Sequence, residues 1–136
     1  MDQVDHEFGE PNPDAPAALS RFAFLIGRWR CEAQVRSANG EWQTFHATWL
    51  GRFILDGYAI ADEYRMTGSS GELIVLGMNF RAYDATKQMW NIKWLNALAG
   101  TWVDLGPVRA TRKWLKETLT YIRIRLYLPP NLTCWA

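Results

Sequence analysis

The stretch that decides the fold is Arg21-Phe-Ala-Phe-Leu-Ile-Gly-Arg-Trp-Arg-Cys-Glu-Ala-Gln-Val-Arg36. In its first part Phe22, Leu25 and Ile26 recur at helical spacing, which predicts a short amphipathic helix over residues 17–26. After Gly27 the period changes to two, because apolar residues alternate with charged or polar ones over residues 29–36. This alternation predicts a half-buried strand with one apolar face. The stretch therefore predicts a helix, a glycine joint and a first strand.

Further segments of strand character follow, and turn signals separate them. They span residues 42–50, 58–66, 72–83, 89–96, 101–105 and 119–128. Asn39-Gly40 predicts a hairpin with a type I′ turn, Asp56-Gly57 predicts a second turn, and Gly77 predicts a bend. Residues 110–118 fit either a helix or a strand. Strands at intervals of about 8–12 residues with turns between them predict an antiparallel barrel or sandwich.

The length and composition predict one globular domain. The chain has 136 residues, of which 49% are hydrophobic and 21% charged, and this is enough for a substantial core. Residues 1–16 contain three prolines among acidic neighbours and are predicted to form a mobile N-terminal arm. Residues 17–136 are predicted to form the domain.

Several classes of protein are disfavoured by the same sequence. Its acidic start is not a secretory signal, and no run approaches the roughly 20 apolar residues of a membrane span. Cys31 and Cys134 lack metal-ligand spacing, so the prediction is reduced thiols in a cytoplasmic protein. Residues 106–136 carry six Lys/Arg and one Asp/Glu, which favours a solvated strand face over nucleic-acid binding. No membrane or nucleic-acid partner and no cofactor is expected.

Four motifs, taken in order and spacing, resemble those of a bacterial lipocalin-like (calycin) family known mainly as a domain of unknown function. They are Phe24-Leu-Ile-Gly-Arg-Trp29, Gly51-Arg-Phe53, Asp62-Glu-Tyr64, and Gly77 with Tyr83-Asp84 and Trp90. The resemblance implies an all-β, antiparallel lipocalin-like barrel of about seven to eight strands with a short N-terminal helix. It assigns no reaction, and the role it implies for Gly27 and Trp29 is structural.

The resemblance also implies one contact and leaves one question open. In lipocalins an arginine of a late strand often stacks on the signature tryptophan, which suggests Arg123 or Arg125 over Trp29. From Gly106 onward the sequence departs from the family's ending, so the barrel is either incomplete at its C-terminal end or closed differently. Because an open strand edge invites pairing with another chain, a homodimer is a hypothesis.

Aromatic residues are the most informative candidates for a binding site. The chain has eight tryptophans, and large aromatics either fill a core or line a pocket. An inward Arg81 would neutralise a carboxylate on a fatty-acid-like ligand. The residues predicted to line a ligand cavity are Trp29, Tyr58, Tyr64, Trp90, Trp94 and Arg81.

Catalysis in the same cavity is the main alternative. Asp62 shares a strand face with Tyr58 and Tyr64, and a carboxylate buried between two phenols is a candidate general acid or base. His46 is more readily explained as a structural or surface histidine than as an acid/base group or a haem ligand. The leading hypothesis is binding of a small apolar or aromatic molecule. A lyase or isomerase, or a filled-barrel interaction module, is the alternative.

Overall fold

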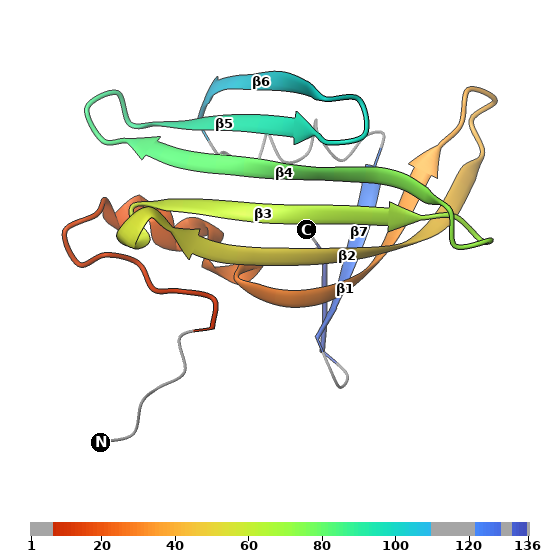
Figure 1. Cartoon of the computed structure of the whole chain (residues 1–136), viewed down its shortest axis with the longest axis horizontal. Helices are drawn as coiled ribbons and strands as arrows, with labels where there is room; N and C mark the ends of the chain where they lie inside the picture. The colour runs from red at the N-terminus through yellow and green to blue at the C-terminus, as the bar shows by residue number, and fades with distance from the viewer. Residues whose placement is uncertain (1–6, 110–121, 129–131, 136) are drawn as a thin grey trace.

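A computed structural model describes residues 7–109, 122–128 and 132–135. These residues form mostly β-structure, in one antiparallel sheet preceded by a short 3₁₀-helix (Figure 1). The elements are η1 (Ala17–Leu25), β1 (Gly27–Arg36), β2 (Trp42–Ile54), η2 (Leu55–Gly57), β3 (Ala59–Thr67), β4 (Leu73–Asp84), β5 (Met89–Asn96), β6 (Thr101–Val108), β7 (Ile122–Leu128) and β8 (Leu132–Trp135). The antiparallel β-class predicted from the sequence is confirmed at this level.

Strands β1 to β6 form a meander in which each strand pairs with the next along the chain. β7 returns to pair with β1 on the opposite side from β2, and β8 pairs with β7. The resulting order is β6-β5-β4-β3-β2-β1-β7-β8. The short strand β8 carries no clear alternation and was not predicted. Residues 110–121, including the segment of ambiguous character, lie outside the described residues.

The helix η1 differs from the sequence prediction in its type. It is a 3₁₀-helix that ends at Leu25, and its buried residues are Leu19, Phe22 and Leu25. These recur every three residues, which is the repeat of a 3₁₀-helix, so this winding places all three on one face. That face packs against β2, β3 and β4, and the helix covers one end of the sheet (Figure 1).

The joint between η1 and β1 depends on two glycines. Gly27 has φ +123°, a region that favours glycine. The indole Nε1 of Trp29 donates to the carbonyl oxygen of Leu25 at 3.2 Å and so binds the strand to the end of the helix. Gly51 lies opposite Gly27 on β2, and a Cβ atom there would overlap the carbonyl group of Leu25. Trp29 is thus a structural residue of the joint.

The β1–β2 hairpin corrects one prediction. Gly40 has φ +85°, but Asn39 does not have positive φ, so the turn is not type I′. The amide of Gly40 donates to the carbonyl of Ser37, and the amide of Ser37 donates to the carbonyl of Glu41. These bonds describe a type I turn followed by a left-handed glycine, the usual three-residue hairpin loop.

The segment predicted as a mobile arm lies partly within the described residues. Residues 1–6 lie outside them. Farther on, the amide of Phe53 donates to the carbonyl of Phe8, and the amide of Asn12 donates to the carbonyl of Gly57. The side chain of Asn12 also donates to the carbonyl of Asp56. Residues 8–12 therefore lie beside the turn at η2, which was predicted at Asp56-Gly57 and in which both residues have positive φ.

The arginine contact that the resemblance implied stays a prediction, because the structure describes the backbone of β7 and not its side chains. Arg123 pairs with Gln34, and Arg125 pairs with Glu32. Both partners alternate with Trp29 along β1, so neither arginine is in register with the tryptophan.

The two cysteines are separated in the same part of the sheet. Cys31 pairs with Leu126, which in turn pairs with Cys134. Two strand spacings of about 4.8 Å each place the two cysteines beyond the reach of a disulfide. Separately, no helix among the described residues is long and apolar enough to cross a membrane.

We predict that Gly51→Ala lowers the free energy of unfolding by about 2–3 kcal/mol, because the new methyl group must displace the end of η1. Gly68→Ala is a matched control, since a Cβ at Gly68 meets only the end of the flexible Glu72 side chain. Urea denaturation of both variants measures the difference. Equal losses of unfolding free energy in the two variants would show that the close approach of η1 to β2 does not contribute to stability.

Candidate functional site

The pairing register defines which residues face the interior of the curved sheet. Trp49 on β2 pairs with Tyr64 on β3, and Tyr64 pairs with Gly77 on β4. Asp62, one row farther along, pairs with Asn79. Because paired residues project to the same side of a sheet, these residues share the concave face. The register also shows which side of β2 faces inward. The buried residue Ala47 lies on the concave face, while His46 is exposed.

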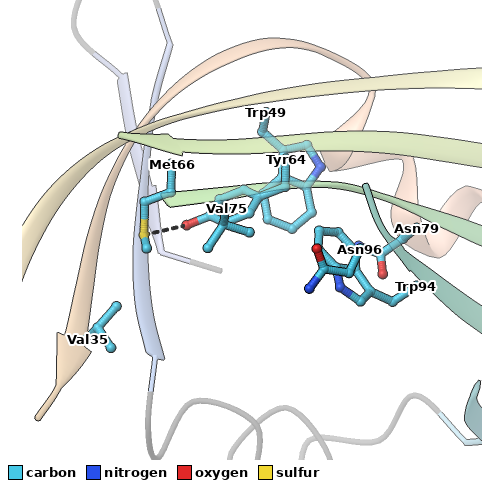
Figure 2. Close-up of a pocket in the computed structure, with 8 residues that line it drawn as sticks. All are labelled: Val35, Trp49, Tyr64, Met66, Val75, Asn79, Trp94 and Asn96. Atoms are coloured by element: carbon cyan, nitrogen blue, oxygen red, sulfur yellow. Dashed lines mark hydrogen bonds between the residues drawn. The ribbon is translucent and has the colours of Figure 1, made fainter. Parts of the chain in front are cut away.

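A cavity of about 400 Å³ lies on the concave face. This volume is within the usual range of small-molecule sites. The lining residues come from strands β1 to β5 and are mainly aromatic or aliphatic (Figure 2). They are Val35, Trp49, Tyr64, Met66, Val75, Asn79, Trp94 and Asn96. None of the eight carries a charge, so the described wall of the cavity is apolar with two amides and one phenol.

One glycine provides the space for the aromatic wall. A Cβ atom at Gly77 would overlap the ring of Trp94, so the indole lies directly over the glycine. Gly77, where the sequence predicts a bend, therefore leaves a gap in the side-chain layer that the indole fills. Figure 2 shows Trp94 beside Asn96 and Asn79 at one end of the cavity.

A buried ion pair lies next to the cavity. Arg81 donates from Nε to Oδ2 of Asp62 at 2.6 Å and from Nη2 to Oδ1 at 3.2 Å. Asn79 donates from Nδ2 to the same Oδ1 at 2.9 Å. Asp62 is fully buried, and Arg81 is 7% exposed. Both carboxylate oxygens are thus occupied by donors, as a buried charge requires.

Aromatic rings connect this ion pair to the helix. The guanidinium carbon of Arg81 lies 4.6 Å from the centroid of the Phe22 ring, a cation–π contact. The Phe22 ring meets Trp90 edge to face at 4.6 Å, and Tyr83 lies 5.3 Å from Trp90. Trp90 is fully buried, and its Nε1 has no hydrogen-bond partner among the described residues. The cluster is a packed core at the η1 end of the sheet.

Burial keeps two groups of the concave face uncharged. It raises the pKa of Cys31 to about 12, so the thiol stays protonated and unreactive at neutral pH. It also raises the pKa of Tyr64 well above its usual range, and the nearby Cys31 adds to this effect. The Tyr64 hydroxyl donates to Sδ of Met66 at 3.7 Å. Sulfur is a weak acceptor, so a better acceptor would readily replace it.

The residues predicted from the sequence to form the site occupy five different environments. Tyr64 and Trp94 line the cavity. Trp90 belongs to the core, and Trp29 belongs to the joint with η1. Arg81 faces inward as predicted, but its charge is neutralised by Asp62 rather than left for a ligand. Tyr58 precedes β3, is 47% exposed and does not line the cavity.

Sequence reasoning missed most of the aliphatic and amide wall. Val35, Met66 and Val75 are scattered over three strands, and only the register brings them together. Asn79 and Asn96 belong to no recognisable sequence motif. The usable signal was the alternation of β3 and β4, which placed Asp62 with Tyr64, and Asn79 with Arg81, on common faces.

The cavity does not have the composition of a metal site. Among the described residues, no group of three or more His, Cys, Asp or Glu side chains is placed to hold a metal ion. Comparisons with protein-family models, with curated proteins and with solved structures find no match to this chain. The geometry of the cavity is therefore the basis for a functional proposal.

We predict that Asp62→Ala lowers the free energy of unfolding by about 3–5 kcal/mol, because it leaves the Arg81 charge buried without its partner. The double variant Asp62→Ala/Arg81→Met should lose less than the sum of the two single variants. Urea denaturation of all four proteins provides the double-mutant cycle. Additive losses would contradict a coupled buried pair.

Proposed function

We propose that this protein binds a small, uncharged apolar or aromatic molecule in the cavity on the concave face. The observation that carries the proposal is a space of about 400 Å³ with an aromatic and aliphatic wall. Trp49, Tyr64 and Trp94 supply large rigid surfaces, and such surfaces gain contact area at little cost in conformational entropy. An interior filled by side chains, as an interaction module would have, would leave no such space.

The position of Asp62 favours binding over proton-transfer catalysis. Its carboxylate accepts three hydrogen bonds from Arg81 and Asn79 and does not line the cavity. A general acid or base must reach the proton that it transfers. Tyr64 does reach the cavity, but its raised pKa makes the phenol a weaker proton donor and keeps the phenolate base from forming at neutral pH. A lyase or isomerase built on these two residues is the less supported alternative.

We also propose that the sheet is a lipocalin-like barrel. Its support is the six-strand meander, the η1 cover and the Trp29 bond to the end of the helix. Closure requires the outermost strands β6 and β8 of the described sheet to pair, directly or through the intervening chain. The alternative is an open β6 edge that pairs with a second copy to form a homodimer.

The first test of binding uses native mass spectrometry of freshly purified protein and tryptophan-fluorescence titration with fatty acids, haem and small neutral aromatics. We predict quenching by the neutral aromatics. Val75→Phe should weaken binding at least tenfold because it fills part of the cavity.

Ile74→Phe is the matched control, since Ile74 lies on the opposite face of the same strand and does not line the cavity. Equal affinity of both variants would show that the ligand binds elsewhere. Absence of any adduct or quenching would count against a binding cavity.

Hydrogen exchange distinguishes closure from an open edge. The amide of Ala97 donates to Leu76 of β4, and hydrogen-bonding directions alternate along a strand. Trp94, three residues before Ala97, therefore directs its amide away from β4 and toward Val103, its partner on β6. The amides of Trp102 and Asp104, on either side of Val103, then face the free side of β6. We predict slow exchange of these two amides at every protein concentration. Rapid exchange would contradict closure, and protection that grows with concentration would indicate the homodimer.

A further inference from the structure

The polar contacts available inside the cavity select among neutral ligands. Asn79 has its Nδ2 fixed on Oδ1 of Asp62 at 2.9 Å. A carboxylate can only accept hydrogen bonds, so the amide cannot be flipped in this environment. Its carbonyl oxygen Oδ1 is then directed away from Asp62. Figure 2 shows this oxygen on the side of Trp94 and Asn96, toward the cavity.

The carbonyl oxygen of Asn79 is an unused acceptor. Asn79 is 8% exposed, and its side-chain hydrogen bond among the described residues is the one from Nδ2 to Asp62. Asp62 is itself held by the two hydrogen bonds from Arg81. The acceptor is therefore rigidly oriented before any ligand enters, and a preorganised polar group discriminates strongly between partners.

Donors are also present in the cavity. The hydroxyl of Tyr64 has only the weak sulfur acceptor of Met66, at 3.7 Å. Asn96 accepts a hydrogen bond from the amide of Ala99 at its Oδ1, which leaves its side-chain NH₂ as a donor. Both residues line the same cavity as Asn79. The wall thus offers one fixed acceptor and several donors, because Trp49 and Trp94 add their indole N–H groups and that of Trp49 has no partner among the described residues. It offers no charge.

We propose that Asn79 determines specificity, and that the ligand is a neutral planar aromatic whose ring carries an N–H donor next to a carbonyl acceptor, that is, an aromatic lactam or secondary amide. The ligand N–H donates to Oδ1 of Asn79, and its carbonyl accepts from the side-chain NH₂ of Asn96, which lies at the same end of the cavity (Figure 2). The aromatic plane packs on Trp94 and Trp49. This inference rests on the proposed function, since it names the ligand class of the same cavity.

A pair of isosteric probes tests the proposal on the native protein. In 2-quinolone the ring carries an N–H beside its carbonyl, and in coumarin an oxygen replaces that N–H. We predict that 2-quinolone binds at least tenfold more tightly than coumarin. Coumarin leaves the carbonyl oxygen of Asn79 without a donor and places its own ring oxygen, a second acceptor, against it. Isothermal titration calorimetry measures both affinities. Quinoline-2-carboxylate should bind more weakly than 2-quinolone, since no described lining residue balances its charge.

Two variants connect the preference to Asn79. Asn79→Ala should reduce the ratio of the two affinities to about one, and Asn79→Ser serves the same purpose if the alanine variant does not fold. Asn91→Ala is the matched control, because Asn91 is exposed on β5 and does not line the cavity. It should leave the preference unchanged.

The outcomes separate the two proposals. Equal binding of 2-quinolone and coumarin to the native protein would overturn the role of Asn79 while leaving a binding cavity in place. Unchanged preference in the Asn79 variants would do the same. If neither probe nor any other neutral aromatic binds, the proposed function itself fails, and the ligand class fails with it.

Discussion

The buried ion pair between Asp62 and Arg81 is the interaction on which the rest of the structure depends. Two charges removed from water are tolerated only when their hydrogen-bonding groups are satisfied in a fixed geometry. Asp62 meets this condition with two bonds from Arg81 and one from Asn79. The pair fixes the register of β3 against β4, because a slip of one residue would turn these groups to the other face. It therefore determines which side chains surround the cavity.

The same pair joins the two ends of the concave face. On one side Arg81 stacks against Phe22 of η1, and so connects the sheet to the helix that covers its end. On the other side Asn79 connects the carboxylate to the cavity wall. A single buried group thus stabilises the core and orients a polar contact of the candidate site. The described cavity wall carries no charge, and the two charged side chains beside it, Asp62 and Arg81, neutralise each other.

The strands in which apolar and polar residues alternate most clearly were the ones predicted best from the sequence. β1 and β5 were predicted closely, since their apolar residues mark one face clearly. The type of η1 was not predicted, because Phe22 and Leu25 fit both the 3.6-residue and the 3.0-residue repeat. In β4 apolar residues occupy both faces, so the alternation did not decide which face lies inward. Met78 and Phe80 face outward while Asn79 and Arg81 face inward, because the ion pair outweighs the hydrophobic pattern.

The candidate site was less predictable than the fold for a physical reason. A cavity wall consists of residues from several strands, and only the register brings Val35, Met66 and Val75 together. The shared face of Asp62 and Tyr64 was visible in the sequence, but the partner that occupies the carboxylate was not. Tyr58 follows the alternation of β3, yet it precedes the strand and is exposed. Periodicity therefore identified candidates, and three-dimensional pairing decided their roles.

The central claim, that the concave cavity is the ligand site, is tested most directly by two-dimensional NMR of ¹⁵N-labelled protein during titration with 2-quinolone. Binding in the cavity should produce saturable shifts of the indole N–H signal of Trp94 and the side-chain amide of Asn79. The indole signal of Trp102, which is 60% exposed and outside the described cavity wall, should stay in place. Shifts confined to Trp102 and its neighbours, or no saturable shift at all, would show that the ligand does not bind in the concave cavity.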